Sequence, residues 1–351
     1  MTQLFYKDKP IIGIEISNTD IKVMSVDSKK WLVHGYGSLD LDPLRIKKSL
    51  EEDNDYLITA MQTLLKEHVV GTLNSNYAVV SVPTTKSYIR TFDIPTNVAD
   101  NLKDAIDIEV DQYIPLPSSA LYVDYEVLSK DKNNVTVLMS AINKTVVDRA
   151  ILAIESADFK TIMVEPSISS VGRMMTATEE GNLPSVIIDI GPATTDIAVV
   201  IDGKVQLNNS VSIGGNTFTL EIAKRLRLSL ANAHQIKVLN GLNAGLRQSK
   251  ITSALKPSLD ILLKEIQKVI RYYNERLNKN KKLEQILIVG SGSNLPGIGE
   301  YYTNALVMPV RVASPWQKLD FADLPTPAKQ HRSRYITVAG LSIVKPGEIW
   351  K

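Results

Sequence analysis

The sequence contains no cysteine among its 351 residues. This absence excludes disulfides, thiolate metal sites and cysteine nucleophiles, and it fits a reducing compartment. Histidine is also scarce, and no pair has the HxH or HxxxH spacing of a zinc site; the four residues are His34, His68, His234 and His331. No run of about eighteen apolar residues occurs, so the sequence predicts no membrane-spanning helix.

Neither positive nor negative residues are in clear excess. The 40 Lys and Arg residues nearly cancel the 38 Asp and Glu residues, which leaves a net charge of +2. Without a global basic field, nucleic acid is not an expected partner. Hydrophobic residues make up 44% of the chain, and at this length they predict two globular domains, each with its own core.

A strand–loop–strand pattern stands at Val186–Asp202, which reads VIIDIGPATTDIAVVID. Asp189 lies within a β-branched run, where an unpaired charge would be costly, so its carboxylate needs a cation or strong donors. The loop that follows has small side chains, which expose backbone N–H groups, and two hydroxyls; its key residues are Gly191, Ala193, Thr194 and Thr195. Such a surface binds phosphate, although a plain β-hairpin is the alternative interpretation.

A second copy of this pattern lies half a chain away at Ile12–Val26, reading IGIEISNTDIKVMSV. Aligning Glu15 with Asp189 places Ser17 on Gly191 and Lys22 on Asp196 without a gap. The duplicated hairpins predict that one phosphate chain is bound from two sides. Each hairpin would supply an acid for a metal and N–H groups for phosphate oxygens.

Two glycine-rich segments complete the pattern. The first follows a predicted strand at 286–289 and precedes a helix expected near Pro296; it consists of Gly290, Ser291, Gly292 and Ser293. Glycine there lets the backbone approach a base or ribose closely. The second opens a predicted helix with Gly214, Gly215 and Asn216, which places N–H groups at the positive end of a helix dipole.

In this order and spacing, the motifs resemble the actin-like ATPase superfamily of actin, the heat-shock chaperone ATPases, sugar kinases and FtsA. Residues 104–128, DAIDIEVDQYIPLPSSALYVDYEVL, resemble the type IV pilus assembly protein PilM family, and the similarity runs from about Ile11 to about Ile343. It implies an α/β, actin-like two-domain fold of duplicated ribonuclease H-like units with an inserted α+β subdomain. We expect residues 1–84 and 335–351 in the first domain, 85–162 in the insert and 163–334 in the second domain.

The resemblance also implies ATP and Mg²⁺ as cofactors. Glu15 and Asp189 would hold the metal through water. The residues expected to contact ATP are Ser17, Asn18, Thr19, Lys22, Gly191, Ala193, Thr194, Thr195, Gly214, Gly215, Asn216, Gly290, Ser291, Gly292 and Ser293. Glu165, before Pro166, resembles the acid that opens the connecting helix of the chaperone ATPases and would orient a water molecule. Alternatively, it is a helix N-terminal charge worth ~0.3–1 kcal/mol.

The first hairpin departs from the superfamily pattern at two positions. Glu15 stands where Asp is usual, and Ser17 stands where Gly usually lets the turn approach phosphate. Both changes are compatible with ATP binding. Because hydrolysis depends on the geometry of metal and water, they predict a nucleotide-binding protein with little or no ATPase activity.

The expected insert carries an acidic amphipathic helix at about 98–113 and a proline-stiffened turn. The helix is either a solvated surface or a docking surface. The turn is either a helix stop or a lip for an extended peptide. In the PilM family, a groove beside the insert takes the N-terminal tail of the membrane protein PilN, which implicates Arg90, Tyr113, Ile114, Pro115 and Leu116.

The expected function is therefore a cytoplasmic ATP-binding scaffold of the type IV pilus inner-membrane assembly complex, with a PilN-like tail as partner. A phosphotransferase of the sugar-kinase type is an alternative, although no motif for a catalytic Asp is evident. An FtsA-like filament-forming protein is another alternative. The closing segment SIVKPGEIWK contains Pro346 and Gly347, which are unsuited to an amphipathic membrane helix, so membrane association is expected only through the partner.

Overall fold

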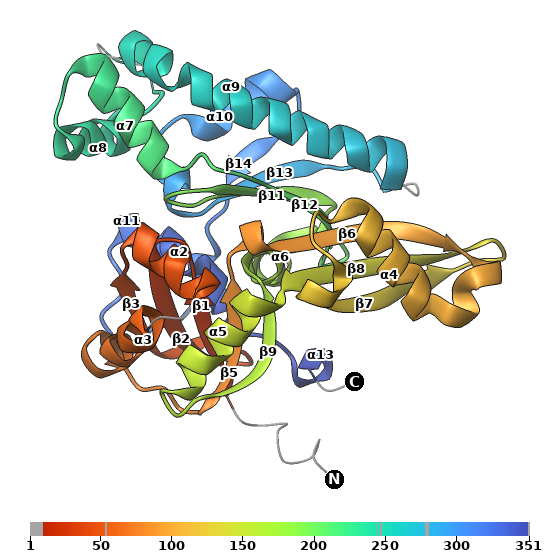
Figure 1. Ribbon diagram of the computed structural model, residues 1–351. Coiled ribbons are helices and arrows are strands. Elements are labelled where there is room, and N and C mark those ends of the chain that lie inside the picture. Colours follow the sequence, from red (N-terminus) through yellow and green to blue (C-terminus); the bar gives the residue numbers. More distant parts are fainter. Residues whose placement is uncertain (1–9, 53–54, 244, 246–247, 278–280, 350–351) are drawn as a thin grey trace. The chain divides into compact units, whose positions relative to one another are not determined.

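The computed structural model describes residues 10–52, 55–243, 245, 248–277 and 281–349 (Figure 1). The chain divides into two compact units. Unit 1 comprises Met1–Ser170, Leu319–Pro325 and Thr337–Lys351, and unit 2 comprises Val171–Lys318 and Thr326–Ile336.

Unit 1 is built on a mixed sheet with the strand order β4-β3-β2-β1-β5-β9. The first hairpin, β1 and β2, is antiparallel, whereas β1 pairs with β5 and β5 with β9 in parallel. The strands are β1 (Ile12–Ile16), β2 (Asp20–Asp27), β3 (Leu32–Asp40), β4 (Val69–Gly71), β5 (Tyr77–Val82) and β9 (Lys160–Pro166). Strands β1 and β5 are almost wholly buried, which explains their continuous apolar sequences.

Helices cover both faces of this sheet. Helices α2 (Pro43–Glu51), α3 (Tyr56–Glu67) and α5 (Lys144–Glu155) contribute to one apolar core with alternate residues of β1 and β5. Helix α12 (Ile336–Ser342) packs closely on the other face, because a Cβ on Gly13 would lie 2.4 Å from the carbonyl oxygen of Val338. The expected insert boundary at residue 162 therefore lies too far along the chain, since α5 and β9 belong to this layer.

The inserted segment proper has its own small core. An antiparallel sheet, β6 (Ser87–Pro95), β8 (Asn134–Asn143) and β7 (Leu121–Lys130), is covered by α4 (Leu102–Tyr113). Ile106 and Val110 of α4 are buried against Val137 and Met139 of the sheet. The acidic helix begins later than predicted, because Thr96–Asn101 forms a 3-10 turn.

Unit 2 repeats the topology of unit 1. Its strands lie in the order β14-β13-β10-β11-β12, which matches β9-β5-β1-β2-β3. Strand β10 is antiparallel to β11 and parallel to β13, and β13 is parallel to β14. Their bounds are β10 (Ser185–Ile190), β11 (Thr195–Ile201), β12 (Lys204–Val211), β13 (Gln285–Val289) and β14 (Val310–Val312). The sequence repeat therefore reflects a duplicated unit.

The helices α7 (Gly215–Leu226), α8 (Leu230–Leu239), α9 (Gln248–Tyr272) and α10 (Ile298–Leu306) build the core of unit 2 with its sheet. The sequence predicts that the long helix starts at Pro257, but α9 begins at Gln248 and contains that proline. Ile251, Ala254 and Leu255 continue its buried stripe upstream. This packing outweighs the hydrogen bond that proline removes.

The remaining α-helices of the described residues are α6 (Ser167–Thr178), which spans the division at Ser170, α11 (Lys329–Arg332) and α13 (Pro346–Ile349). Within the described ranges, no helix combines the length and the hydrophobicity needed to cross a bilayer.

Candidate functional site

The hairpin of unit 2 has the register that the sequence repeat predicts. Asp189 lies opposite Asp196, and the turn closes with a 2.9 Å hydrogen bond from Gly191 N to Thr194 O. Thr195, however, is fully buried and donates its hydroxyl to the carbonyl of Ile213 at 2.7 Å. Of the two predicted threonines, Thr195 therefore holds the turn in place.

The double-glycine turn before α7 packs directly on this hairpin. Gly215 N and Asn216 N donate to the carbonyls of Gly191 and Pro192, both at 2.9 Å. A Cβ on Gly214 would lie 2.6 Å from the oxygen of Gly191. The glycines therefore allow two backbones to meet, and the N–H groups of Gly215 and Asn216 already have hairpin partners.

The third segment, Gly290–Ser293, reaches the same hairpin. Gly290 has φ +82°, and a Cβ there would lie 2.2 Å from Oδ1 of Asp189. A Cβ on Gly292 would lie 2.2 Å from the side chain of Ile190, and Ser293 Oγ donates to Gly290 O at 2.7 Å. The structure thus brings three predicted segments of unit 2 together at the hairpin turn that follows Asp189.

The sequence analysis missed Lys237 of α8, which is 8% exposed and lies behind the double-glycine turn. Its Nζ donates to Gly215 O at 2.8 Å and to Thr219 Oγ1 at 2.9 Å. Burial lowers the pKa of Lys237 to about 8. In the sequence, Lys237 follows the buried Ala233 by four residues, so both lie on the inner face of α8. This spacing is the signal that could have identified Lys237.

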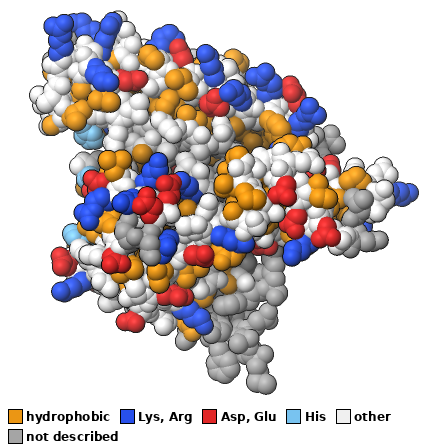
Figure 2. Space-filling view, in the orientation of Figure 1, with side chains coloured by type: hydrophobic (Ala, Val, Ile, Leu, Met, Phe, Trp, Pro, Cys, Tyr) orange, Lys and Arg blue, Asp and Glu red, His pale blue; other side chains and the backbone are white. Residues whose placement is uncertain are grey.

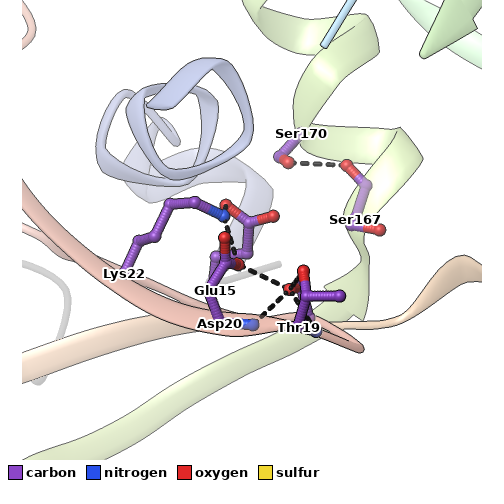
Figure 3. Close-up of polar contacts among 7 residues, drawn as sticks. Glu15, Thr19, Asp20, Lys22, Ser167 and Ser170 are labelled. Carbon is purple, nitrogen blue, oxygen red and sulfur yellow. Dashed lines mark hydrogen bonds and ion pairs between the residues drawn. The ribbon is translucent and has the colours of Figure 1, made fainter. Parts of the chain in front are cut away.

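The hairpin of unit 1 forms a buried ion cluster (Figure 3). Lys22 Nζ lies 2.6 Å from Oδ1 of Asp20 and 3.1 Å from Oε2 of Glu15. Burial alone would lower the pKa of Lys22, but attraction to Asp20 and Glu15 outweighs it and raises that pKa. Asp20, which the sequence analysis did not select, therefore shares the cation with the predicted metal ligand.

Ser17 closes the turn of this hairpin from within. Its hydroxyl donates to Asp20 Oδ1 at 2.5 Å and accepts the N–H groups of Thr19 and Asp20 at 3.1 and 3.0 Å. Ser17 N donates to Asp20 O at 2.9 Å. The backbone N–H groups of this turn therefore bond to atoms of the turn itself. A glycine at position 17 would have no hydroxyl to accept the N–H groups of Thr19 and Asp20.

Glu165 is buried at the end of β9, opposite Ser81. The Glu165–Pro166 pair ends this strand, and α6 begins one residue later, at Ser167. A hydrogen bond of 2.8 Å joins the hydroxyls of Ser167 and Thr84. Ser170 Oγ donates to Ser167 O at 2.7 Å (Figure 3). The water-orienting role of Glu165 stays a prediction.

The predicted peptide-groove residues differ in exposure. The Arg90 guanidinium lies 3.7 Å from the ring centroid of Tyr113, which is 54% exposed, while Leu116 is half-buried at the edge of the insert core. Ile114 is 6% exposed and belongs to that core. Ile114 therefore packs inward directly after α4, and its place in the peptide groove stays a prediction.

Residues 13–345 match the profile of a family described as type IV pilus assembly protein PilM. The chain belongs to the PilM family. A solved structure of a PilM-PilN type IV pilus biogenesis complex is similar, with a TM-score of 0.78 and 19% identity over 96% of this chain and 98% of that chain. The ethanolamine utilization protein EutJ of Carboxydothermus hydrogenoformans has a TM-score of 0.56 and 14% identity, over 95% and 88%. The predicted actin-like two-domain α/β fold is confirmed.

Curated relatives of this PilM-family protein include the cell division protein FtsA of Neisseria meningitidis serogroup B, 28% identical over 200 residues. That match covers 51% of this chain and 46% of the relative. The cell shape-determining protein Mbl of Bacillus subtilis is 24% identical over 179 residues, or 42% and 53% of the two chains. The chain spans about half the length of these relatives.

In the described part of the chain, no group of three His, Cys, Asp or Glu side chains could hold a metal ion. Mg²⁺ usually keeps several waters and binds through one or two carboxylates and substrate phosphates. The carboxylate of Asp189, beside the turn 191–194, is a ligand type that such an ion accepts.

Proposed function

We propose that this PilM-family protein is a cytoplasmic ATP-binding scaffold of the type IV pilus assembly complex that holds the N-terminal tail of a PilN-like membrane protein. The observation that carries the proposal is that two glycine-rich segments, 214–216 and 290–293, pack on the small-residue hairpin of Asp189. Isothermal titration of the purified chain with ATP and Mg²⁺ tests it. Absence of binding up to millimolar ATP would reject it.

The unit 2 segments have distinct roles in this proposal. Asp189 orients the water shell of Mg²⁺, and the turn at 191–194 faces the phosphates. Residues 214–216 and 290–293 supply four glycines, where the backbone is open for ribose and base to lie on it. Lys237 adds a positive charge behind the double-glycine turn. The first hairpin, with Glu15, Ser17, Asn18, Thr19 and Lys22, has the pattern of a phosphate loop within unit 1.

We expect ATP hydrolysis to be far slower than the enzyme median of about 10 per second. The reason is the closed turn of Ser17, in which Lys22 is shared with Asp20 and two backbone N–H groups bond to the serine hydroxyl. A phosphate must compete with these partners for the same donors. Phosphate release measured with excess ATP and Mg²⁺ checks the expectation, and a turnover near the median would favour the phosphotransferase alternative.

ATP affinity should fall about tenfold between pH 7 and pH 9, because Lys237 with a pKa of about 8 loses its charge over this range. Burial lowers the pKa of His234, so this histidine changes its charge below the range of pH 7 to pH 9. The Lys237→Met variant should bind weakly and without this pH dependence. Folding stability should change in the opposite direction: the folded pKa lies below the usual 10.5, so stability rises as pH increases from about 8. A steep pH dependence retained in Lys237→Met would contradict the assignment.

Tail docking should depend on the lip formed by Tyr113 and Leu116. Replacing Leu116 with Asp is expected to weaken binding of a labelled PilN-like N-terminal peptide at least about tenfold, since a charge would enter an apolar contact. Fluorescence anisotropy measures the affinity. Tyr122→Ala, which removes another exposed tyrosine of the same insert, is the matched control and should bind normally. Equal affinity in both variants would place the groove elsewhere.

A further inference from the structure

The two hairpins of the sequence repeat share one backbone turn. The repeat places Ser17 on Gly191 and Asp20 on Thr194. Ser17 N donates to the carbonyl of Asp20 at 2.9 Å, and Gly191 N donates to the carbonyl of Thr194 at the same distance. The two turns therefore have the same length and the same closing hydrogen bond, so their side chains can be compared position by position.

The two turns differ in charge at their last position. In unit 2 this position is the half-buried, neutral Thr194. In unit 1 it is Asp20, whose Oδ1 accepts a hydrogen bond from Ser17 Oγ at 2.5 Å. Lys22 Nζ donates to the same oxygen at 2.6 Å (Figure 3). The turn of the first hairpin thus contains an anion that the turn of the second hairpin lacks.

This anion and its cation are buried. Figure 2 shows blue and red side chains exposed across the visible face of the molecule, whereas Asp20 and Lys22 are each only 3% exposed. Lysine and hydroxyl groups bind the oxygens of carboxylates and of phosphates with the same charge-assisted hydrogen bonds. The two donors that Asp20 occupies are therefore of the kind that a phosphate would use.

A phosphate and Asp20 compete for Lys22. Lys22 Nζ also lies 3.1 Å from Oε2 of Glu15. A phosphate bound beside Lys22 would add a third anion to two carboxylates around one buried cation. Repulsion between like charges is strong where water is excluded. A phosphate and the Asp20 carboxylate therefore exclude each other at this position.

We propose that Asp20 is an internal substitute for phosphate, which fills the anion position of the first hairpin and sets the affinity of this hairpin for phosphate groups. The inference rests on the proposed ATP-binding function for the source of the phosphate. A phosphate enters the first hairpin only when the Asp20 carboxylate leaves Lys22 and the hydroxyl of Ser17. In the second hairpin, the corresponding Thr194 carries no charge that repels a phosphate.

Pyrophosphate is a suitable probe beside ATP, because it lacks ribose and base. Asp20→Thr, which copies the residue of the unit 2 turn, should bind both ligands at least about tenfold more tightly than the wild type, because Lys22 and the Ser17 hydroxyl then bond to phosphate. Isothermal titration of the full chain, with and without Mg²⁺, measures the affinities. Adding Lys22→Met to Asp20→Thr should remove the gain, which assigns it to the first hairpin.

Two further variants complete the test, and circular dichroism checks that each variant is folded. Asp20→Asn keeps an acceptor for Ser17 but loses the charge, so it should show a smaller gain in the same direction, and it carries the test if Asp20→Thr does not fold. Asp40→Thr is the matched control, because Asp40 is exposed and is the cross-strand neighbour of Asp20. The charge of an exposed side chain is screened, so both affinities should stay within about threefold of the wild type.

The outcomes separate this inference from the proposed function. Equal affinities of the wild type and Asp20→Thr for both ligands would overturn the role of Asp20, even if both proteins bind ATP. Weaker binding by Asp20→Thr in the presence of Mg²⁺ would also overturn it, because that result identifies Asp20 as a metal ligand. If Asp20→Thr gains affinity for pyrophosphate while no variant binds ATP, the role of Asp20 stands and the ATP-binding function is rejected.

Discussion

Replacing Asp189 with alanine is expected to weaken ATP·Mg²⁺ binding by about 100-fold. The carboxylate lies at the turn where all three unit 2 segments meet, with Gly290 so close that a Cβ would touch Oδ1. Losing its charge-assisted hydrogen bonds to the metal-bound waters costs about 2–3 kcal/mol, which corresponds to roughly 30- to 150-fold in affinity. Isothermal titration at fixed Mg²⁺ concentration measures the loss.

The matched control for this variant is Asp196→Asn. Asp196 is paired with Asp189 across the hairpin, and it accepts a hydrogen bond from Ser210 Oγ at 2.5 Å, which asparagine can also accept. The control should therefore keep the hairpin and its affinity for ATP. Chelating Mg²⁺ should weaken the wild type but change Asp189→Ala little. Equal affinity of Asp189→Ala and the wild type would remove Asp189 from the site.

The hairpins were predictable because their signals are local. An acid inside a β-branched run and a small-residue turn determine both the register and the position of the loop. The same pattern at Glu15 and Asp189 therefore gave matching pairs, Glu15 with Lys22 and Asp189 with Asp196. The family resemblance added the order of the segments, which local patterns alone do not determine.

Other features depend on tertiary contacts that no local pattern encodes. Helix α5 follows the insert in sequence but packs with α2 and α3, so the sequence could not show where the insert ends. The closed turn of Ser17 depends on a carboxylate, Asp20, whose acceptor role appears only once the turn is folded. Lys237 is separated from Gly215 by 22 residues, and packing of α8 against α7 brings the two together.

The Gly290→Ala variant should destabilise unit 2 by about 3–5 kcal/mol. Gly290 has φ 82° and ψ 173°, a backbone conformation that is essentially restricted to glycine and costs other residues about 1–3 kcal/mol. The added methyl would also lie 2.2 Å from Asp189 Oδ1 and 2.6 Å from Ile190 O, so the strand end or the carboxylate must move. For a unit of this size, the melting temperature should fall by roughly 10 °C or more. Thermal unfolding followed by circular dichroism measures the shift.

Gly215→Ala provides the comparison that separates folding from binding. A Cβ there would meet only Lys237 Nζ at 3.5 Å and backbone atoms at 3.8 Å, which are ordinary contact distances, so the protein should unfold close to the wild-type temperature. Its methyl would nevertheless lie between Lys237 and the glycine segments proposed for the nucleotide, and ATP affinity should fall. If Gly290→Ala melts like Gly215→Ala, the Gly290 backbone tolerates a side chain and the close approach to Asp189 is not required for folding. If Gly215→Ala binds ATP normally, the double-glycine turn lies outside the nucleotide site.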